Sequence, residues 1–166
     1  MERRDVEMNL FELTGKIVFI TGGTRGIGLS IAMAMKEAGA KVWIHGSKEE
    51  STAKIAKKYG FSYVYGNLKE VEKIDEMLNP FLQEEEKLDV LVNNAAFETH
   101  CEMQEICEEE LDAVYNVNTK SPLFIIQKVL PLIRKAGGGS IINVTSIHQK
   151  VPVRTNGAYC LSKSAL

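Results

Sequence analysis

Five short apolar runs alternate with longer amphipathic stretches along this chain of 166 residues. Each run is rich in Val, Ile or aromatic residues and is nearly unbroken by polar ones, as expected for strands covered on both faces. Strands that alternate with helices build an α/β domain around a parallel sheet, which is the fold class that we expect here. The runs are Lys16–Thr21, Lys41–His45, Ser62–Tyr65, Leu88–Asn93 and Ser140–Thr145.

Apolar residues that recur at spacings of three and four predict helices between these runs. Ser121 and Pro122 form a good N-cap and first-turn pair for one of these helices. Pro80 is expected to break or kink another, because proline costs about 3 kcal/mol inside a regular helix. The acidic runs Glu84–Glu86 and Glu108–Glu110 are expected to lie on solvated helix faces. The expected helices cover 27–38, 71–82, 108–118 and 121–136.

Composition excludes several classes of protein. Twenty Lys and Arg stand against 22 Asp and Glu, so the net charge is −2, which argues against nucleic acid or a membrane surface as the main partner. No stretch approaches the roughly 18 apolar residues of a membrane span, and the N-terminus lacks the apolar centre of a secretory signal. Three cysteines at irregular spacings predict no disulfide framework, no metal site and a cytoplasmic location.

The length suits one domain, expected over 13–166 after an N-terminal extension at 1–12.

The segment Thr21–Gly28, with the sequence TGGTRGIG, joins the first run to the first helix. Gly22 permits a tight turn, Gly26 lets a pyrophosphate approach the backbone, and Gly28 permits close packing of helix and strand. The N-terminus of the helix adds free N–H groups and partial positive charge. No Lys follows the last glycine to reach a terminal phosphate, so dinucleotide binding is favoured over ATP hydrolysis.

The end of the second run indicates which dinucleotide is bound. A carboxylate at this position accepts hydrogen bonds from the adenosine ribose and repels a 2′-phosphate. Here the sequence is His45-Gly46-Ser47-Lys48, and no acid occurs before Glu49. Arg25, Ser47 and Lys48 could instead meet a phosphate, so we predict NADP(H) rather than NAD(H).

Near the C-terminus, Ser146 precedes the segment Tyr159-Cys160-Leu161-Ser162-Lys163. Tyr and Lys four residues apart share one side of a helix. A tyrosine acting as a base near neutral pH needs its pKa lowered by about three units, or roughly 4 kcal/mol. A cation about 4 Å away in an effective dielectric of about 20 supplies that much. Lys163 could provide this charge, and Ser146 could hydrogen-bond the substrate oxygen.

Five motifs follow one another in a characteristic order: TGGTRGIG at Thr21–Gly28, NNAA at Asn93–Ala96, the Asn of VNT at Asn118, VTS ending at Ser146, and YCLSK at Tyr159–Lys163. With them the chain resembles the short-chain dehydrogenase/reductase family over about Leu13–Leu166. The resemblance implies a Rossmann-like, doubly wound parallel sheet. It also implies that Tyr159 is the general acid/base, that Lys163 binds the nicotinamide ribose and lowers the tyrosine pKa, that Ser146 positions the substrate oxygen, and that Asn118 holds a helix kink and a water.

The same resemblance implies a set of residues that bind the dinucleotide. Asn67 and Leu68 belong to this set although relatives usually have an acid before the aliphatic residue, and Asn94 would support the central strand and the cofactor edge. The implied cofactor-binding residues are Gly22, Thr24, Arg25, Gly26, Ile27, Gly28, Ser47, Asn67, Leu68, Asn94, Tyr159 and Lys163.

Two functions stay open. The first is an oxidoreductase acting on a carbonyl or alcohol substrate of the sugar, polyol or 3-oxoacyl type, since the polar segment Ile147–Asn156 is expected to line the pocket mouth. The resemblance also implies a homo-oligomer that pairs through the helix at 121–136 and the helix that begins at Tyr159, if the missing part of the second helix is present or replaced. The second is a truncated relative that only binds dinucleotide or serves as an interaction module, because relatives continue beyond the Tyr–Lys helix with further strands. On that view Ser140–Thr145 becomes a sheet edge with an uncovered apolar face.

Overall fold

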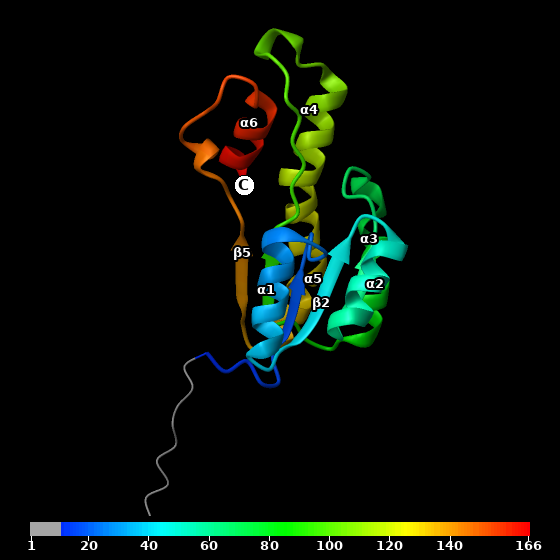
Figure 1. Ribbon diagram of the computed structural model, residues 1–166. Helices are drawn as coiled ribbons and strands as arrows, with labels where there is room; N and C mark the ends of the chain where they lie inside the picture. Colours follow the sequence, from blue (N-terminus) through cyan, green and yellow to red (C-terminus); the bar gives the residue numbers. More distant parts are fainter. Residues whose placement is uncertain (1–10) are drawn as a thin grey trace, which may run out of the picture.

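The computed structural model describes residues 11–166, so most of the expected N-terminal extension lies outside the described residues. Five parallel strands form one sheet in the order β3-β2-β1-β4-β5 (Figure 1). This arrangement confirms the expected α/β, doubly wound fold. The strands are β1 (Ile17–Ile20), β2 (Lys41–Gly46), β3 (Ser62–Tyr65), β4 (Val90–Asn93) and β5 (Ser140–Asn143).

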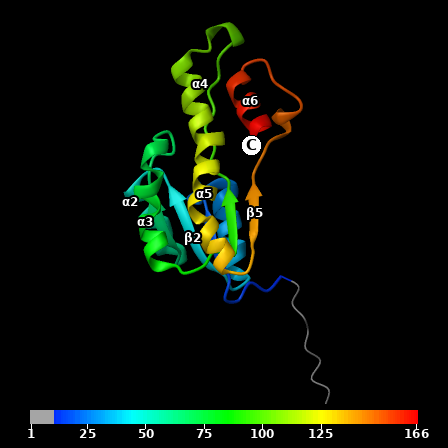
Figure 2. The same ribbon diagram turned by 180° about the vertical axis from the view of Figure 1, so that it is seen from behind.

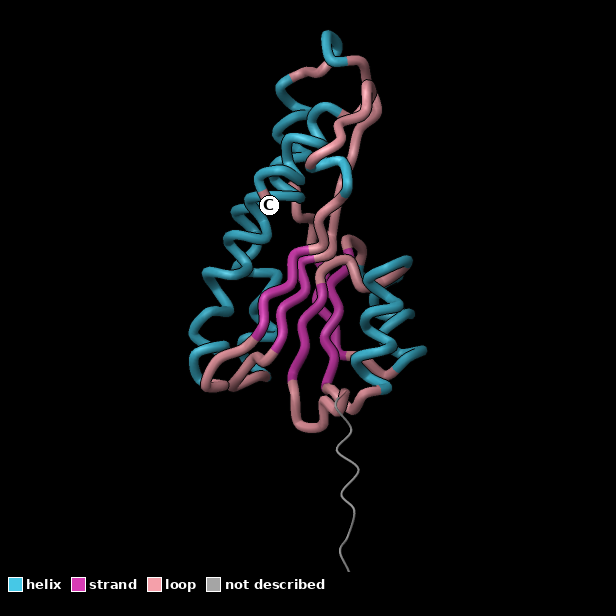
Figure 3. Tube along the Cα trace, turned by 90° about the vertical axis from the view of Figure 1, so that its left-hand side faces the viewer, coloured by secondary structure: helices cyan, strands magenta, loops and turns pink. Residues whose placement is uncertain are grey.

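Helices cover both faces of the sheet, as the view along its edge shows (Figure 3). On one face, α1 (Gly26–Glu37) and α2 (Glu49–Tyr59) share a core with Val18 and Ile20 of β1. On the other face, α3 (Ile74–Glu84) and α5 (Ser121–Lys135) pack on the alternate residue, Phe19. The ring of Phe19 lies 4.9 Å from that of Phe81 on α3, measured between centroids. Alternate residues of β1 therefore belong to two separate cores.

A single helical run extends beyond the sheet on the α5 side. It consists of α4 (Glu108–Tyr115), a π-helical turn at Asn116–Lys120, and α5. The last helix, α6 (Gly157–Ala165), lies beside the upper part of this run (Figures 1 and 2). The expectation that Ser121 caps a separate helix is wrong, because Lys120 and Ser121 both have right-handed helical backbone angles. The Ser121 hydroxyl instead donates to the Leu68 carbonyl at 2.8 Å.

Three local details differ from the sequence-based expectations. Helix α3 runs through Pro80 without a break. Glu85 is buried rather than solvated, since its carboxylate accepts a hydrogen bond from Trp43 at 2.6 Å and pairs with Lys41. Helix α2 was not expected, because its buried residues are the small Thr52 and Ala56, which make a weak apolar stripe.

Strand β5 forms one edge of the sheet, as expected. Ile141 and Ile142 point to opposite faces of the strand, and they are 40% and 43% exposed. Over residues 11–166, no helix combines the length and the apolarity needed to cross a membrane.

Candidate functional site

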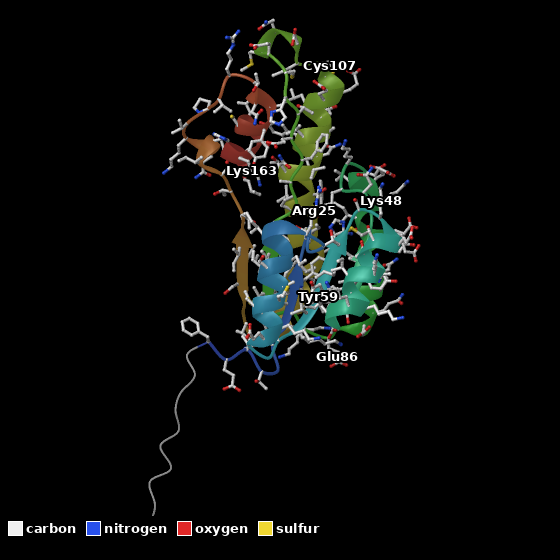
Figure 4. All side chains as sticks on the ribbon, in the orientation of Figure 1. Arg25, Lys48, Tyr59, Glu86, Cys107 and Lys163 are labelled. Atoms are coloured by element: carbon white, nitrogen blue, oxygen red, sulfur yellow. The ribbon has the colours of Figure 1, made fainter. Side chains whose placement is uncertain are left out.

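A cleft of about 590 Å³ opens at the carboxyl ends of the central strands. Open parallel sheets bind their ligands at this end, where the connecting loops diverge. Figure 4 shows Arg25, Lys48 and Lys163 toward this end of the molecule, and Tyr59 and Glu86 toward the other. Ten of the residues expected to bind a dinucleotide line the cleft together: Gly22, Thr24, Arg25, Gly26, Ile27, Gly28, Ser47, Asn67, Leu68 and Asn94.

A second, larger groove of about 800 Å³ runs between β3 and α3. It shares four residues with the cleft but includes no residue of the glycine turn at 21–28. Volume alone therefore does not identify the dinucleotide site. The uncapped backbone N–H groups described below favour the smaller cleft.

The glycine turn is shaped by two left-handed residues, Gly22 with a φ of 65° and Gly26 with a φ of 54°. A Cβ atom on Gly22 would lie 2.9 Å from the Ala95 Cα, so a side chain is sterically excluded there. A Cβ atom on Gly26 would meet no atom within 4 Å, which leaves its backbone open to a ligand. These surroundings suit a backbone that must be approached by a pyrophosphate.

Helix α1 begins directly after this turn with Arg25 at its N-cap. No side chain caps it, and its first turn holds no acid. The leading N–H groups are therefore available to an anion, and the helix dipole favours negative charge at this point.

Asn94, directly after β4, is hydrogen-bonded to Thr21 and Gly22 of the turn. The Asn94 amide donates to the carbonyls of Thr21 and Gly22 at 3.0 and 3.2 Å. The Thr21 hydroxyl accepts the backbone N–H groups of Asn94 and Ala95, each at 3.0 Å. The Asn94 amide thus holds the turn that a cofactor would contact.

His45, at the end of β2, also lines the cleft and is 3% exposed. Its Nδ1 atom accepts the Gly22 N–H at 3.4 Å, and its Nε2 atom lies 3.0 Å from the Gly66 carbonyl. Donation from Nε2 to that carbonyl fits the neutral tautomer. Burial lowers the pKa of His45 to about 4, so the ring is neutral at physiological pH. His45 therefore links the glycine turn to the loop after β3.

The region expected to meet a 2′-phosphate is open. Arg25, Ser47 and Lys48 are all exposed, and the last of these is the N-cap of α2 without a side-chain cap. The Asn67 side chain is already engaged in its own turn, since it accepts the Lys69 N–H at 3.2 Å and donates to Glu70 at 3.1 Å.

The Tyr–Lys pair lies on α6, outside the residues that line the cleft. Lys163 is buried, its ammonium donates to the Val144 carbonyl at 2.7 Å, and burial lowers its pKa. The ammonium lies 5.9 Å from the centroid of the half-buried Tyr159 ring. The two side chains thus share one side of the helix, as their spacing predicts.

Asn118 connects the cleft to α6. It is fully buried in the π-helical turn, and its side chain bonds both the N–H and the carbonyl of Phe97 at 2.8 Å. Its amide also donates to the Ser162 hydroxyl at 2.9 Å, and that hydroxyl donates to the Tyr159 carbonyl at 2.8 Å. Phe97 lines the cleft, so a continuous chain of hydrogen bonds runs from the cleft wall to the helix that carries Tyr159.

Ser146 begins the short turn Ile147–Gln149, which packs against α6. Its hydroxyl accepts the His148 N–H at 3.2 Å, and no hydrogen bond from it to Tyr159 occurs in residues 11–166. Two members of the polar segment that follows are already paired: His148 with the Val151 carbonyl and Arg154 with Glu102.

Sequence reasoning did not identify the other residues that line the cleft: His45, Gly46, Gly66, Lys69, Ala95, Ala96, Phe97 and Val117. Most of them lie just after a strand, so their position in the topology is the signal that could have found them. Over residues 11–166, no group of three or more His, Cys, Asp or Glu side chains could hold a metal ion.

The fold and the cleft define a Rossmann-like α/β protein of the dinucleotide-binding type. A match of the short chain dehydrogenase family to residues 16–166 narrows this class, and the chain belongs to that family. An uncharacterized oxidoreductase of Thermotoga maritima is 34% identical over 92% of this chain. The 7alpha-hydroxysteroid dehydrogenase of Clostridium sardiniense is 33% identical over 93% of it. In each case the match covers 62% of the relative, so the chain spans less than two thirds of these proteins.

Solved structures of related proteins also match this chain. A 3-oxoacyl (acyl-carrier-protein) reductase from Agrobacterium tumefaciens, with NADP bound, superposes with a TM-score of 0.89 at 27% identity. The match covers 98% of this chain and 66% of the reductase. A gluconate 5-dehydrogenase from Burkholderia cenocepacia, in complex with NADP and tartrate, has a TM-score of 0.85 at 29% identity over 93% of this chain and 63% of that one.

Proposed function

We propose that this chain holds the cofactor site and the catalytic residues of an NADP(H)-dependent oxidoreductase that acts on a carbonyl or alcohol substrate. The observation that carries the proposal is the glycine turn at the cleft, where the uncapped start of α1 and the open backbone of Gly26 provide N–H groups for a diphosphate. The short-chain dehydrogenase family and its NADP-bound structural neighbours support it.

NADP(H) is the cofactor that we propose over NAD(H). Arg25 lines the cleft beside Ser47, and no carboxylate lines the cleft among the described residues. A 2′-phosphate would therefore meet a cation and a hydroxyl without an opposing negative charge. Titration of the chain with NADPH and NADH tests this choice, and equal affinities would reject it.

The catalytic roles that we propose are those that the family resemblance implies for residues on and around α6. Bound nicotinamide supplies the hydride in reduction and accepts it in oxidation. Tyr159 gives its proton to the substrate oxygen in reduction and takes it back in oxidation. Lys163, whose buried ammonium lies 5.9 Å from the centroid of the Tyr159 ring, binds the nicotinamide ribose beside it. Ser146 holds the substrate oxygen, and Asn118 fixes Phe97 and α6 in their relative positions.

Replacement of Tyr159 with Phe tests this mechanism. The variant should lose turnover by about a hundredfold or more, because general acid–base catalysis contributes that much, while NADPH affinity stays unchanged. Turnover is measured over a panel of sugars, polyols and ketones, and binding is measured by NADPH fluorescence. Retained turnover in the variant would reject the role of Tyr159.

The same panel separates the two functions that the sequence leaves open. NADPH binding together with turnover supports the oxidoreductase. Binding without turnover on any substrate supports a protein that only binds dinucleotide. We propose sugars, polyols and 3-oxoacyl compounds as the substrate classes, in line with the motifs near Ser146 and Tyr159.

We also propose that the chain forms a homo-oligomer through α5 and α6. Leu123 and Phe124 on α5 are 62% and 39% exposed, and Leu161 on α6 is 53% exposed. Exposed apolar side chains such as these are common where one protein chain contacts another. The three free cysteines fit a reducing, cytoplasmic compartment, which is the location that we propose.

A further inference from the structure

We propose that Lys69 is a further dinucleotide-binding residue, whose ammonium contacts the diphosphate of the bound coenzyme. The inference rests on the proposed function, because it places the same coenzyme in the same cleft. Lys69 belongs to none of the motifs in the sequence, but it lines the cleft from the loop after β3.

The backbone of Lys69 is fixed on both sides. Its N–H donates to the Asn67 side chain at 3.2 Å, and its carbonyl accepts the Asn116 side-chain amide at 3.0 Å. The preceding carbonyl, of Leu68, is held by Ser121 at 2.8 Å. Since Asn116 and Ser121 belong to the helical run that also carries Asn118, the loop is anchored, and only the Lys69 side chain is free to change its contact.

That side chain reaches across the cleft. Its ammonium lies 3.6 Å from the centroid of the Phe97 ring, which follows β4. In the sheet, β2 and β1 lie between β3 and β4, so the contact spans the carboxyl ends of the two central strands. The glycine turn follows β1, and its Gly22 approaches Ala95, two residues before Phe97. The ammonium is therefore held close to the turn at which a diphosphate is expected.

Charge favours the same assignment. Among residues 11–166, Arg25 and Lys69 are the Lys and Arg side chains that line the cleft, and no carboxylate lines it. His45 is neutral there. The neighbouring Glu70 is engaged with Lys73 and Asn67. Over residues 11–166, Lys69 forms no ion pair. A cation over an aromatic ring in an exposed position is held more weakly than one bonded to a phosphate, so a diphosphate can draw the ammonium from Phe97.

The two cations then have different targets. Arg25 and Ser47 both line the cleft, and we assign them to the 2′-phosphate, which is present only in NADP(H). Lys69 lines the same cleft from the loop after β3, and its ammonium rests on the Phe97 ring in the loop after β4. Its target is the diphosphate, which NAD(H) and NADP(H) share, so its removal should weaken both coenzymes equally.

The experiment compares Lys69→Met with the wild-type chain in titrations with NADPH and with NADH, and coenzyme fluorescence reports the binding. We expect Lys69→Met to raise both dissociation constants by about tenfold, as for the loss of a hydrogen bond to a charged group. The effect should shrink at about 0.5 M NaCl, because salt screens the charge. Lys57→Met is the matched control, since Lys57 is exposed on α2 and does not line the cleft.

A second measurement separates ligand binding from simple support of the loop. If Lys69 only fastens the loop, Lys69→Met should weaken adenosine as much as ADP, and the inference is overturned. If Lys69 binds the diphosphate, Lys69→Met weakens ADP and leaves the affinity for adenosine unchanged. Circular dichroism spectra of the variants check that each is folded.

The remaining outcomes are also decisive. Unchanged binding by Lys69→Met overturns the inference and leaves the proposed function standing. Loss of NADPH affinity alone overturns the assignment to the diphosphate. A wild-type chain that binds neither coenzyme overturns the proposed function and this inference together.

Discussion

Gly26 and Gly15 adopt similar left-handed conformations in different places, with φ angles of 54° and 75°. A Cβ atom at either position would meet no atom within 4 Å, but only Gly26 lines the cleft. Steric clash with neighbouring atoms therefore does not explain why glycine occurs at either position. Gly26 differs from Gly15 because a ligand is expected to approach its backbone in the cleft.

This pair allows a matched comparison. Gly26→Ala and Gly15→Ala should each cost about 1–2 kcal/mol of unfolding free energy, the usual penalty for a left-handed alanine. Gly26→Ala alone should lower NADPH affinity, by about tenfold or more, because its methyl group occupies the approach to the turn. Urea unfolding and fluorescence titration give the two quantities. An equal loss of affinity in both variants would contradict the role of Gly26.

His45 predicts a dependence of stability on pH. Its pKa is about 4 in the folded chain and about 6.5 when unfolded, so between these values the unfolded chain binds more protons. Stability therefore falls as pH falls through this window, by about 2 kcal/mol from pH 7 to about pH 5. Urea unfolding across this range should show the loss in the wild type, and His45→Gln should remove that part of it. Parallel curves for the two chains would count against the neutral, buried ring.

At the scale of elements, the π-helical turn at Asn116–Lys120 joins parts of the molecule that are distant in sequence. Asn116 and the adjacent Ser121 hold the loop after β3, and Asn118 holds the loop after β4. Thr119 donates to the Ser162 carbonyl of α6 at 3.1 Å. Both walls of the cleft and the helix with Tyr159 are thus attached to one short segment.

Ser121→Ala tests how firmly this segment holds its neighbours. Ser121 and Leu68 are buried, so the substitution leaves the Leu68 carbonyl without its partner. We expect a loss of about 1–3 kcal/mol in unfolding free energy. Ser51→Ala is the control, because the Ser51 hydroxyl bonds a carbonyl at an exposed position of α2 and should matter little. Similar unfolding curves for the two variants would show that water replaces the lost bond.

At the scale of the whole molecule, β5 is an edge strand within residues 11–166 and has apolar residues on both faces. Unpaired edges of this kind promote association between chains. Replacing both Ile141 and Ile142 with Lys should therefore lower light scattering at high protein concentration. Met33→Lys, on an exposed position of α1, should leave scattering unchanged. Equal scattering by the wild type and the β5 variant would assign any association to another surface, such as α5 and α6.

The sequence was most informative where apolar pattern and topology agree. The run Ser62–Tyr65 coincides with β3, whereas Leu88–Asn93 is longer than β4, because Leu88 is buried before the ladder begins. Residues of the glycine turn line one cleft with Ser47, Asn67 and Asn94, which follow other strands. They lie together because the carboxyl ends of parallel strands meet at the same edge of the sheet. Their roles in binding and catalysis stay predictions.

Other features of the structure could not be predicted from the sequence. The spacing of residues at 116–120 does not distinguish a π-helical turn from a regular one, so the run from α4 to α5 was expected as two helices, and only the helix kink that the resemblance implies at Asn118 indicated an irregularity there. The roles of His45 and Lys69 depend on contacts with residues far along the chain, Gly22 and Phe97, which no local pattern encodes.

The π-helical turn also restricts how the chain can change in length. A π-helical turn closes i→i+5 hydrogen bonds, so it takes up one residue more than the i→i+4 bonds of a regular helix. Losing one residue between 116 and 120 would convert this segment to a regular helix with α5 still in place, and the turn that holds Asn118 against Phe97 and Ser162 would be lost. Inside α5 no such turn takes up the change, so a one-residue deletion there would rotate the residues that follow by about 100° and carry their buried side toward solvent.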